Sequence, residues 1–170
     1  MPNNMIKKYP PLEVFAPLSF AFIFIVMLIY SRFEPHVEDV DAAYVKANAG
    51  QPGYVLVDTR PAEDYEGKSP RSGIPGGHIP GAVSFPLNGL NIREASEALK
   101  HAGITMDKTI IIYCNTGVLS GKFADQLVRH YNFKATKLKN YRGGIVEWVK
   151  NPDNILLPPN HETGVPLTEY

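Results

Sequence analysis

The sequence predicts an α/β protein in which helices flank a parallel sheet of about four or five strands, preceded by one transmembrane helix. Two observations carry this prediction. Short runs of β-forming residues alternate with helical patterns between residues 37 and 150, and an uncharged apolar run comes before them. We therefore divide the 170 residues into a short N-terminal segment (1–11), a transmembrane helix (12–31), an α/β domain (32–150) and an extended C-terminal tail (151–170).

The first expected element is a membrane helix in the run FAPLSFAFIFIVMLIY, which starts at Phe15. The uncharged stretch around it is about 18 residues long, near the lower limit for crossing a hydrocarbon core. It lacks the polar stripe of a buried globular helix, and no small-x-small cleavage site follows it, so an uncleaved anchor is favoured over a signal peptide. Lys7 and Lys8 precede it, which favours a domain on the extracytoplasmic, periplasmic side.

Four strands are expected in the domain. They are short runs of β-branched, aromatic and other apolar residues at 54–58, 82–85, 109–114 and 134–138. The third run, TIIIYC, is the most apolar, as expected for a central strand of a parallel sheet. Helical patterns lie between and around the strands, at 37–47, 90–103, 118–131 and 145–150. This alternation predicts a parallel sheet with helices on both faces.

Composition excludes several classes of protein. Lys and Arg together number 17, as do Asp and Glu, so the net charge is zero and gives no electrostatic reason to bind nucleic acid. One cysteine cannot form an internal disulfide. The five histidines are scattered with no pair at ligand spacing, so no metal site is expected.

The single cysteine, Cys114, stands at the predicted carboxyl end of the central strand, where open α/β sheets bind their ligands. A short loop then leads into a helix N-terminus. Backbone N–H groups of such a loop can converge on the sulfur, and the helix dipole adds positive potential. Both effects favour the reactive thiolate, although many lone cysteines are simply small core residues.

Four segments, in the same order, resemble a single-domain rhodanese, a family of sulfurtransferases. They are VLVDTRPAEDYEGK, GGHIPGAVSFPL, YCNTGVLSGKFA and the closing YRGGIVEWVK. The GHIPGA stretch (77–82) and the GG…W pattern at Gly143, Gly144 and Trp148 are the most specific. The resemblance covers about two thirds of the chain and implies the rhodanese-like parallel-sheet fold.

The resemblance also implies a mechanism. Cys114 is the expected catalytic nucleophile, which takes the outer sulfur of a donor as a persulfide and passes it to a thiol or another nucleophile. The donor and persulfide are expected to bind at the loop that follows: Asn115, Thr116, Gly117, Val118, Leu119 and Ser120. No metal and no organic cofactor is required. The expected partners are a small sulfur donor, a thiol acceptor, the membrane and other membrane-protein subunits.

Leu119 departs from the family pattern. Many rhodaneses carry an arginine five residues after the cysteine, which binds an anionic donor such as thiosulfate, and Leu119 occupies that position. The absence of this arginine weakens the case for thiosulfate as the sulfur donor more than the case for persulfides or polysulfides. A related phosphatase would need an arginine six residues after the cysteine, where Ser120 stands.

Two functions therefore remain open at the level of the sequence. One is an anchored sulfurtransferase or sulfur carrier that uses Cys114. The other is a non-catalytic, rhodanese-like accessory subunit of a larger membrane complex, favoured by the substituted loop and by the proline-rich tail. Asp58 and Arg60 are expected to be structural ties near a strand end, and His78 is expected to fix its own Gly-Pro loop through hydrogen bonds. Ile155, Leu156 and Leu157 in the tail are either loose or docked on the domain or a partner.

Overall fold

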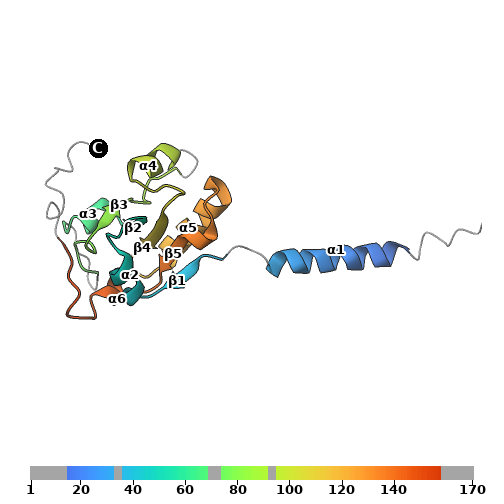
Figure 1. Cartoon of the computed structure of the whole chain (residues 1–170), viewed down its shortest axis with the longest axis horizontal. Helices are drawn as coiled ribbons and strands as arrows, with labels where there is room; N and C mark the ends of the chain where they lie inside the picture. The colour runs from blue at the N-terminus through green and yellow to red at the C-terminus, as the bar shows by residue number, and fades with distance from the viewer. Residues whose placement is uncertain (1–14, 33–35, 69–73, 92–94, 158–170) are drawn as a thin grey trace, which may run out of the picture. The chain divides into compact units, whose positions relative to one another are not determined.

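The computed structural model describes residues 15–32, 36–68, 74–91 and 95–157. The chain divides into two compact units, Met1–Pro35 and His36–Tyr170. The described residues of the first unit form helix α1 (Phe15–Arg32), and the second unit contains the α/β domain (Figure 1). Within the described ranges no helix is both long and apolar enough to span a membrane, so the predicted transmembrane helix is not confirmed. The first three residues of that predicted span, 12–14, lie outside the described part.

The domain is built on a five-stranded parallel sheet in the order β1-β5-β4-β2-β3. Its strands are β1 (Glu38–Val40), β2 (Tyr54–Asp58), β3 (Ala82–Ser84), β4 (Thr109–Tyr113) and β5 (Leu138–Tyr141). As expected from its apolar sequence, β4 lies at the centre of the sheet, paired with β2 and β5. This confirms the predicted α/β fold with a parallel sheet.

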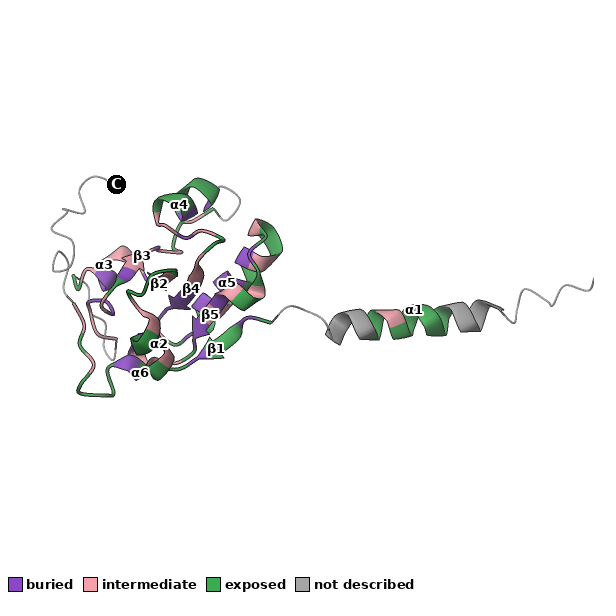
Figure 2. Ribbon diagram, viewed as in Figure 1, coloured by how far each residue is buried: buried purple, intermediate pink, exposed green. Residues whose placement is uncertain are grey.

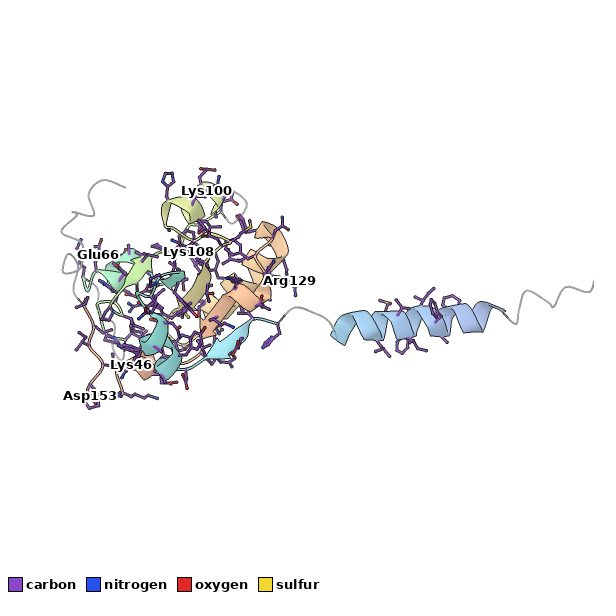
Figure 3. The ribbon with its side chains drawn as sticks, in the orientation of Figure 1. Lys46, Glu66, Lys100, Lys108, Arg129 and Asp153 are labelled. Atoms are coloured by element: carbon purple, nitrogen blue, oxygen red, sulfur yellow. The ribbon has the colours of Figure 1, made fainter. Side chains whose placement is uncertain are left out.

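Helices cover both faces of the sheet. They are α2 (Ala42–Asn48), α3 (Ala62–Tyr65), α4 (Ala95–His101), α5 (Val118–Tyr131) and α6 (Gly144–Trp148). Alternate residues of β4 belong to two separate cores, in which Ile110 and Ile112 pack with residues of α4 and α5, while Ile111 and Tyr113 pack with residues of α2, α3 and α6 (Figure 2). The ammonium group of Lys46 on α2 also lies 5.8 Å from the ring centroid of Trp148 on α6 (Figure 3). Fully burying β4 in this way explains why its sequence lacks polar alternation.

Three element boundaries differ from the predictions. The helical pattern at 37–47 is a short edge strand, β1, followed by α2. The predicted strand at 134–138 is mostly a 3-10 helix, Ala135–Lys137, and the real strand β5 begins at Leu138. The short helix α3 had no counterpart in the prediction. Each of these elements is too short to show a clear hydrophobic period.

A buried ion pair ties the end of β2 to the loop rich in glycine and proline. Arg60 Nη2 lies 2.6 Å from Asp58 Oδ2, and both side chains are almost fully buried. The Arg60 guanidinium also donates to the carbonyl oxygens of Pro75 (3.2 Å) and Gly77 (2.5 Å). The structural roles predicted for Asp58 and Arg60 are thereby confirmed.

The start of the C-terminal tail packs on the domain. Residues His78 and Leu157 form an antiparallel bridge, with N–H···O distances of 3.1 and 2.9 Å. Leu156 packs against the core on the α6 side, whereas Ile155 stays exposed. The ring of His78 in turn stacks on that of Tyr65, with centroids 3.9 Å apart. Residues up to 157 therefore hold the glycine- and proline-rich loop in place, and the rest of the predicted tail lies outside the described residues.

Candidate functional site

The cysteine directly follows β4, at the carboxyl edge of the sheet between β2 and β5. Cys114 is a free thiol and is 4% exposed. Its carbonyl oxygen accepts a hydrogen bond from the N–H of Ile145 (3.0 Å), and that of Asn115 accepts from Val146 (3.2 Å). The first turn of α6 therefore fixes the backbone on which the sulfur is carried.

Two glycines allow this loop and the turn before α6 to touch backbone to backbone. Gly144 has φ +59°, and a Cβ there would lie 2.5 Å from the carbonyl oxygens of Cys114 and Asn115. Gly117 has φ +74°, and a Cβ there would collide with the carbonyl oxygen of Arg142. Because an L side chain neither adopts these φ values readily nor fits these spaces, glycine is required at both positions.

The N-terminus of α5 faces this loop without a side-chain cap. Gly117 is the N-cap residue and has no side chain with which to accept from the first-turn N–H groups. Helix α5 is 14 residues long, so its dipole adds partial positive charge at the same end. Uncapped N–H groups at a helix N-terminus form a site suited to an anion, such as the terminal sulfur of a persulfide.

The predicted substrate-binding residues fall into two groups. Gly117 and Ser120 are buried and Asn115 is half-buried, whereas Thr116, Val118 and Leu119 are exposed. The side chains of Val118 and Leu119 are 53% and 60% exposed, so the outer surface of the first α5 turn is apolar. The roles assigned to Asn115 through Ser120 in binding stay a prediction.

Sequence reasoning missed a buried polar contact of the cysteine. Ser120 Oγ lies 3.6 Å from Cys114 Sγ and 2.7 Å from Oδ1 of Asn140 on β5. The side-chain amide of Asn140 also contacts the Asp39 carboxylate on β1 and the Gly117 carbonyl. The sequence carried no specific signal for Asn140, because it follows the charged Lys139 and the predicted strand ended two residues before it.

Two polar side chains near the carboxyl edge of the sheet are engaged in contacts of their own. Burial raises the pKa of Tyr113 well above its ordinary value, so its phenol stays protonated, and its oxygen accepts a hydrogen bond from the Ile79 N–H (3.1 Å). Arg142 forms an exposed ion pair with Asp39 (3.0 Å). An apolar cavity of about 230 Å³ lies between α4 and Phe133 and includes no residue of the cysteine loop. The thiol and the uncapped helix N-terminus are therefore the candidate chemical groups at this edge.

These features define an α/β domain in which a buried free thiol lies between a central parallel strand and a helix N-terminus. A model of the Rhodanese-like domain family matches residues 41–151, about two thirds of the chain. The protein belongs to the rhodanese-like family.

Curated relatives agree with this assignment. Thiosulfate/3-mercaptopyruvate sulfurtransferase 1 of Arabidopsis thaliana is 34% identical over 134 residues, which cover 72% of this chain and 34% of that protein. Sulfur carrier protein TtuD of Thermus thermophilus is 31% identical, over 65% of this chain and 43% of that protein. Uncharacterized protein YqhL of Bacillus subtilis is 31% identical, over 65% of this chain and 68% of that protein. This chain thus spans about a third of the Arabidopsis enzyme, and the sulfurtransferase and sulfur-carrier relatives support a role in sulfur transfer.

Solved structures share the fold. The anaerobic ergothioneine biosynthesis enzyme from Chlorobium limicola superposes with a TM-score of 0.61 at 23% identity. The alignment covers 71% of this chain and 32% of that chain. At this identity the likeness concerns the architecture of the domain.

Proposed function

We propose that this protein is a sulfurtransferase or sulfur carrier that moves sulfane sulfur through a persulfide on Cys114 to a thiol acceptor. One observation carries the proposal. Within a rhodanese-like domain, Cys114 directly follows the central strand β4, and a three-residue loop leads from it to the uncapped N-terminus of α5. That place suits a thiolate and an anionic persulfide, because both gain from nearby N–H groups and the helix dipole.

The proposed reaction has two steps, uptake of sulfur by Cys114 and its delivery to an acceptor. In the first, the Cys114 thiolate attacks the outer sulfur of a hydropersulfide or polysulfide, an S–S bond of the donor breaks, and the donor leaves as a thiolate. In the second, an acceptor thiolate attacks the terminal sulfur of the Cys114 persulfide, and the Cys114 thiolate is regenerated. No net oxidation occurs and no cofactor takes part.

Burial of Cys114 is compatible with this chemistry. The persulfide adds a second sulfur about 2 Å beyond Sγ, so the reactive atom lies farther out than the cysteine side chain itself. The neighbouring first turn of α5 presents Val118 and Leu119 to solvent. With an exposed leucine at the position of the usual arginine, hydropersulfides and polysulfides are the proposed donors, and the thiosulfate dianion is disfavoured.

Intact-mass measurement tests this proposal. The full-length protein is incubated with polysulfide and freed of small molecules, and its intact mass is compared with that of the Cys114→Ser variant treated in the same way. We expect the wild type to gain the mass of sulfur and the variant, which has no other cysteine, to gain none. If Cys114 gains no sulfur from polysulfide while iodoacetamide still alkylates it, the proposal fails and the accessory-subunit function takes its place.

We also propose that α1 attaches the domain to a membrane, with the domain on the extracytoplasmic side. The residues of α1 whose side chains are described are apolar, and Phe20, Phe22 and Phe24 are all more than 60% exposed. So many exposed aromatic and aliphatic groups favour an apolar environment. We expect the full chain to remain with the membrane fraction after a carbonate wash and a chain starting at His36 to be released. Recovery of the full chain in the wash would contradict this attachment.

A further inference from the structure

A chain of four side chains ends at the sulfur of the cysteine. It begins at Asp39 on β1, continues through Asn140 on β5 and Ser120 on α5, and reaches Cys114. Ser120 is fully buried and Asn140 is 3% exposed, so the hydrogen bonds at the sulfur end are shielded from water, whereas the Asp39 side chain at the other end is 39% exposed. The direction of each bond follows from the donors and acceptors that each group possesses.

The orientation of the Asn140 amide is fixed by two acceptors. Its Nδ2 lies 2.7 Å from the Asp39 carboxylate and 3.1 Å from the carbonyl oxygen of Gly117. Neither of those oxygens can donate a hydrogen bond, so a flipped amide would place its own oxygen against both of them. Oδ1 of Asn140 must therefore face Ser120, at 2.7 Å.

This orientation decides the role of the Ser120 hydroxyl. Because Oδ1 of Asn140 can only accept, the single hydroxyl hydrogen of Ser120 is donated to it. The lone pairs of Oγ are left to face the sulfur, 3.6 Å away. A thiol can donate to such an oxygen, whereas a thiolate cannot.

We propose that Ser120, held by Asn140 and Asp39, is a positioning residue that accepts a hydrogen bond from the Cys114 thiol. The bond directs the S–H group toward α5 and must break when the thiolate attacks a donor. This inference deepens the proposed function, since it describes the nucleophile before sulfur arrives. Gly121 on α5 allows the contact, because a Cβ at that position would lie only 3.2 Å from Nδ2 of Asn140.

Charged groups on the surrounding elements do not replace this bond. Asp58 at the end of β2 pairs with Arg60, and Arg142 after β5 pairs with Asp39. Other charged side chains on these elements include Lys139 on β5, which pairs with Glu38, and Lys122 on α5 and Glu147 on α6. These last two are unchanged in every variant compared below, so their effect on the thiol cancels.

The infrared S–H stretching band tests the proposal without any sulfur donor. The chain has one cysteine, so this band reports Cys114 alone. In the full-length Ser120→Ala variant we expect the band to move to higher wavenumber, because the thiol loses its acceptor. We also expect iodoacetamide to alkylate Cys114 about threefold faster at neutral pH, since the hydrogen bond that holds the S–H group toward α5 is lost. A band that stays in place or moves to lower wavenumber, or slower alkylation, overturns the proposal.

A second variant, on the exposed edge strand β1, keeps the proposal testable if Ser120→Ala does not fold. Asp39→Asn removes the charge that polarises the Asn140 amide, so the band should shift in the same direction by a smaller amount. Glu38→Gln is the matched control, because Glu38 precedes Asp39 on β1 and pairs with Lys139 instead. Identical bands in Asp39→Asn and Glu38→Gln contradict the proposal. Since the spectrum is recorded before any donor is added, its outcome does not depend on whether Cys114 transfers sulfur.

Discussion

Replacing Leu119 with arginine is expected to turn thiosulfate into an effective sulfur donor. The side chain lies in the first turn of α5 and is 60% exposed, so a guanidinium can be added there without disturbing the core. A charge-assisted hydrogen bond to the donor is worth about 1.5–3 kcal/mol, which corresponds to a roughly 10- to 150-fold faster loading of Cys114 by thiosulfate. Loading is followed by intact mass at a thiosulfate concentration far below saturation.

Two comparisons make the Leu119→Arg result specific. Loading by polysulfide should change by less than about threefold, because that donor carries no sulfonate group for the guanidinium to bind in a forked geometry. Val118→Arg adds the same charge on the adjacent exposed residue, and it should give a much smaller gain. Equal gains in the two variants would show that net charge alone matters, and no gain in Leu119→Arg would remove Leu119 as the cause of donor preference.

Replacing Gly117 with alanine is expected to cost about 3 kcal/mol or more of folding stability and to abolish sulfur loading. The residue has φ +74°, and a Cβ there would collide with the Arg142 backbone, which belongs to the turn before α6. Relief of that clash must separate the cysteine loop from the turn that orients it. Urea unfolding gives the stability, and intact mass after polysulfide treatment gives the loading.

Gly53→Ala separates the cost of backbone strain from the cost of the clash with the Arg142 backbone. Gly53 has φ +82°, but a Cβ added there would have no other atom within 4 Å, so only backbone strain applies. Alanine at that position should cost about 1–2 kcal/mol and leave sulfur loading intact. If Gly117→Ala is no more damaging than Gly53→Ala, the close contact between loop and turn does not support the site.

The sequence was sufficient to predict the part of the fold that depends on strong local signals. The run TIIIYC has no charged residue and is dominated by β-branched side chains, which indicates a strand buried on both faces. Because Cys114 is the last residue of this run, the prediction also placed it at the carboxyl edge of the sheet. The glycine and the helix after the cysteine then indicated an anion site. The exposure of Leu119 also agrees with the sequence, because Leu119 lies in the first turn of an amphipathic helix, on the side away from the core.

The polar network around the sulfur could not be predicted in this way. Asn140 meets Ser120 only because β5 begins at Leu138, and the sequence KATKL suggested a strand that ends there. A shift of a few residues in one strand changes which side chains reach the cysteine, and no local period fixes that register. Asp39 was hidden for a related reason, because β1 is a three-residue edge strand with one buried side chain.

Delivery of sulfur from Cys114 to a thiol tests the central claim most directly. The persulfidated full-length protein is freed of donor and mixed with a single equivalent of a small thiol. The masses of the protein and of the thiol are then measured by mass spectrometry. We expect the protein to return to its original mass while the thiol gains one sulfur, and Cys114 to accept sulfur again in a second round. If the added sulfur stays on the protein, Cys114 stores sulfur without transferring it, and the proposed function is wrong.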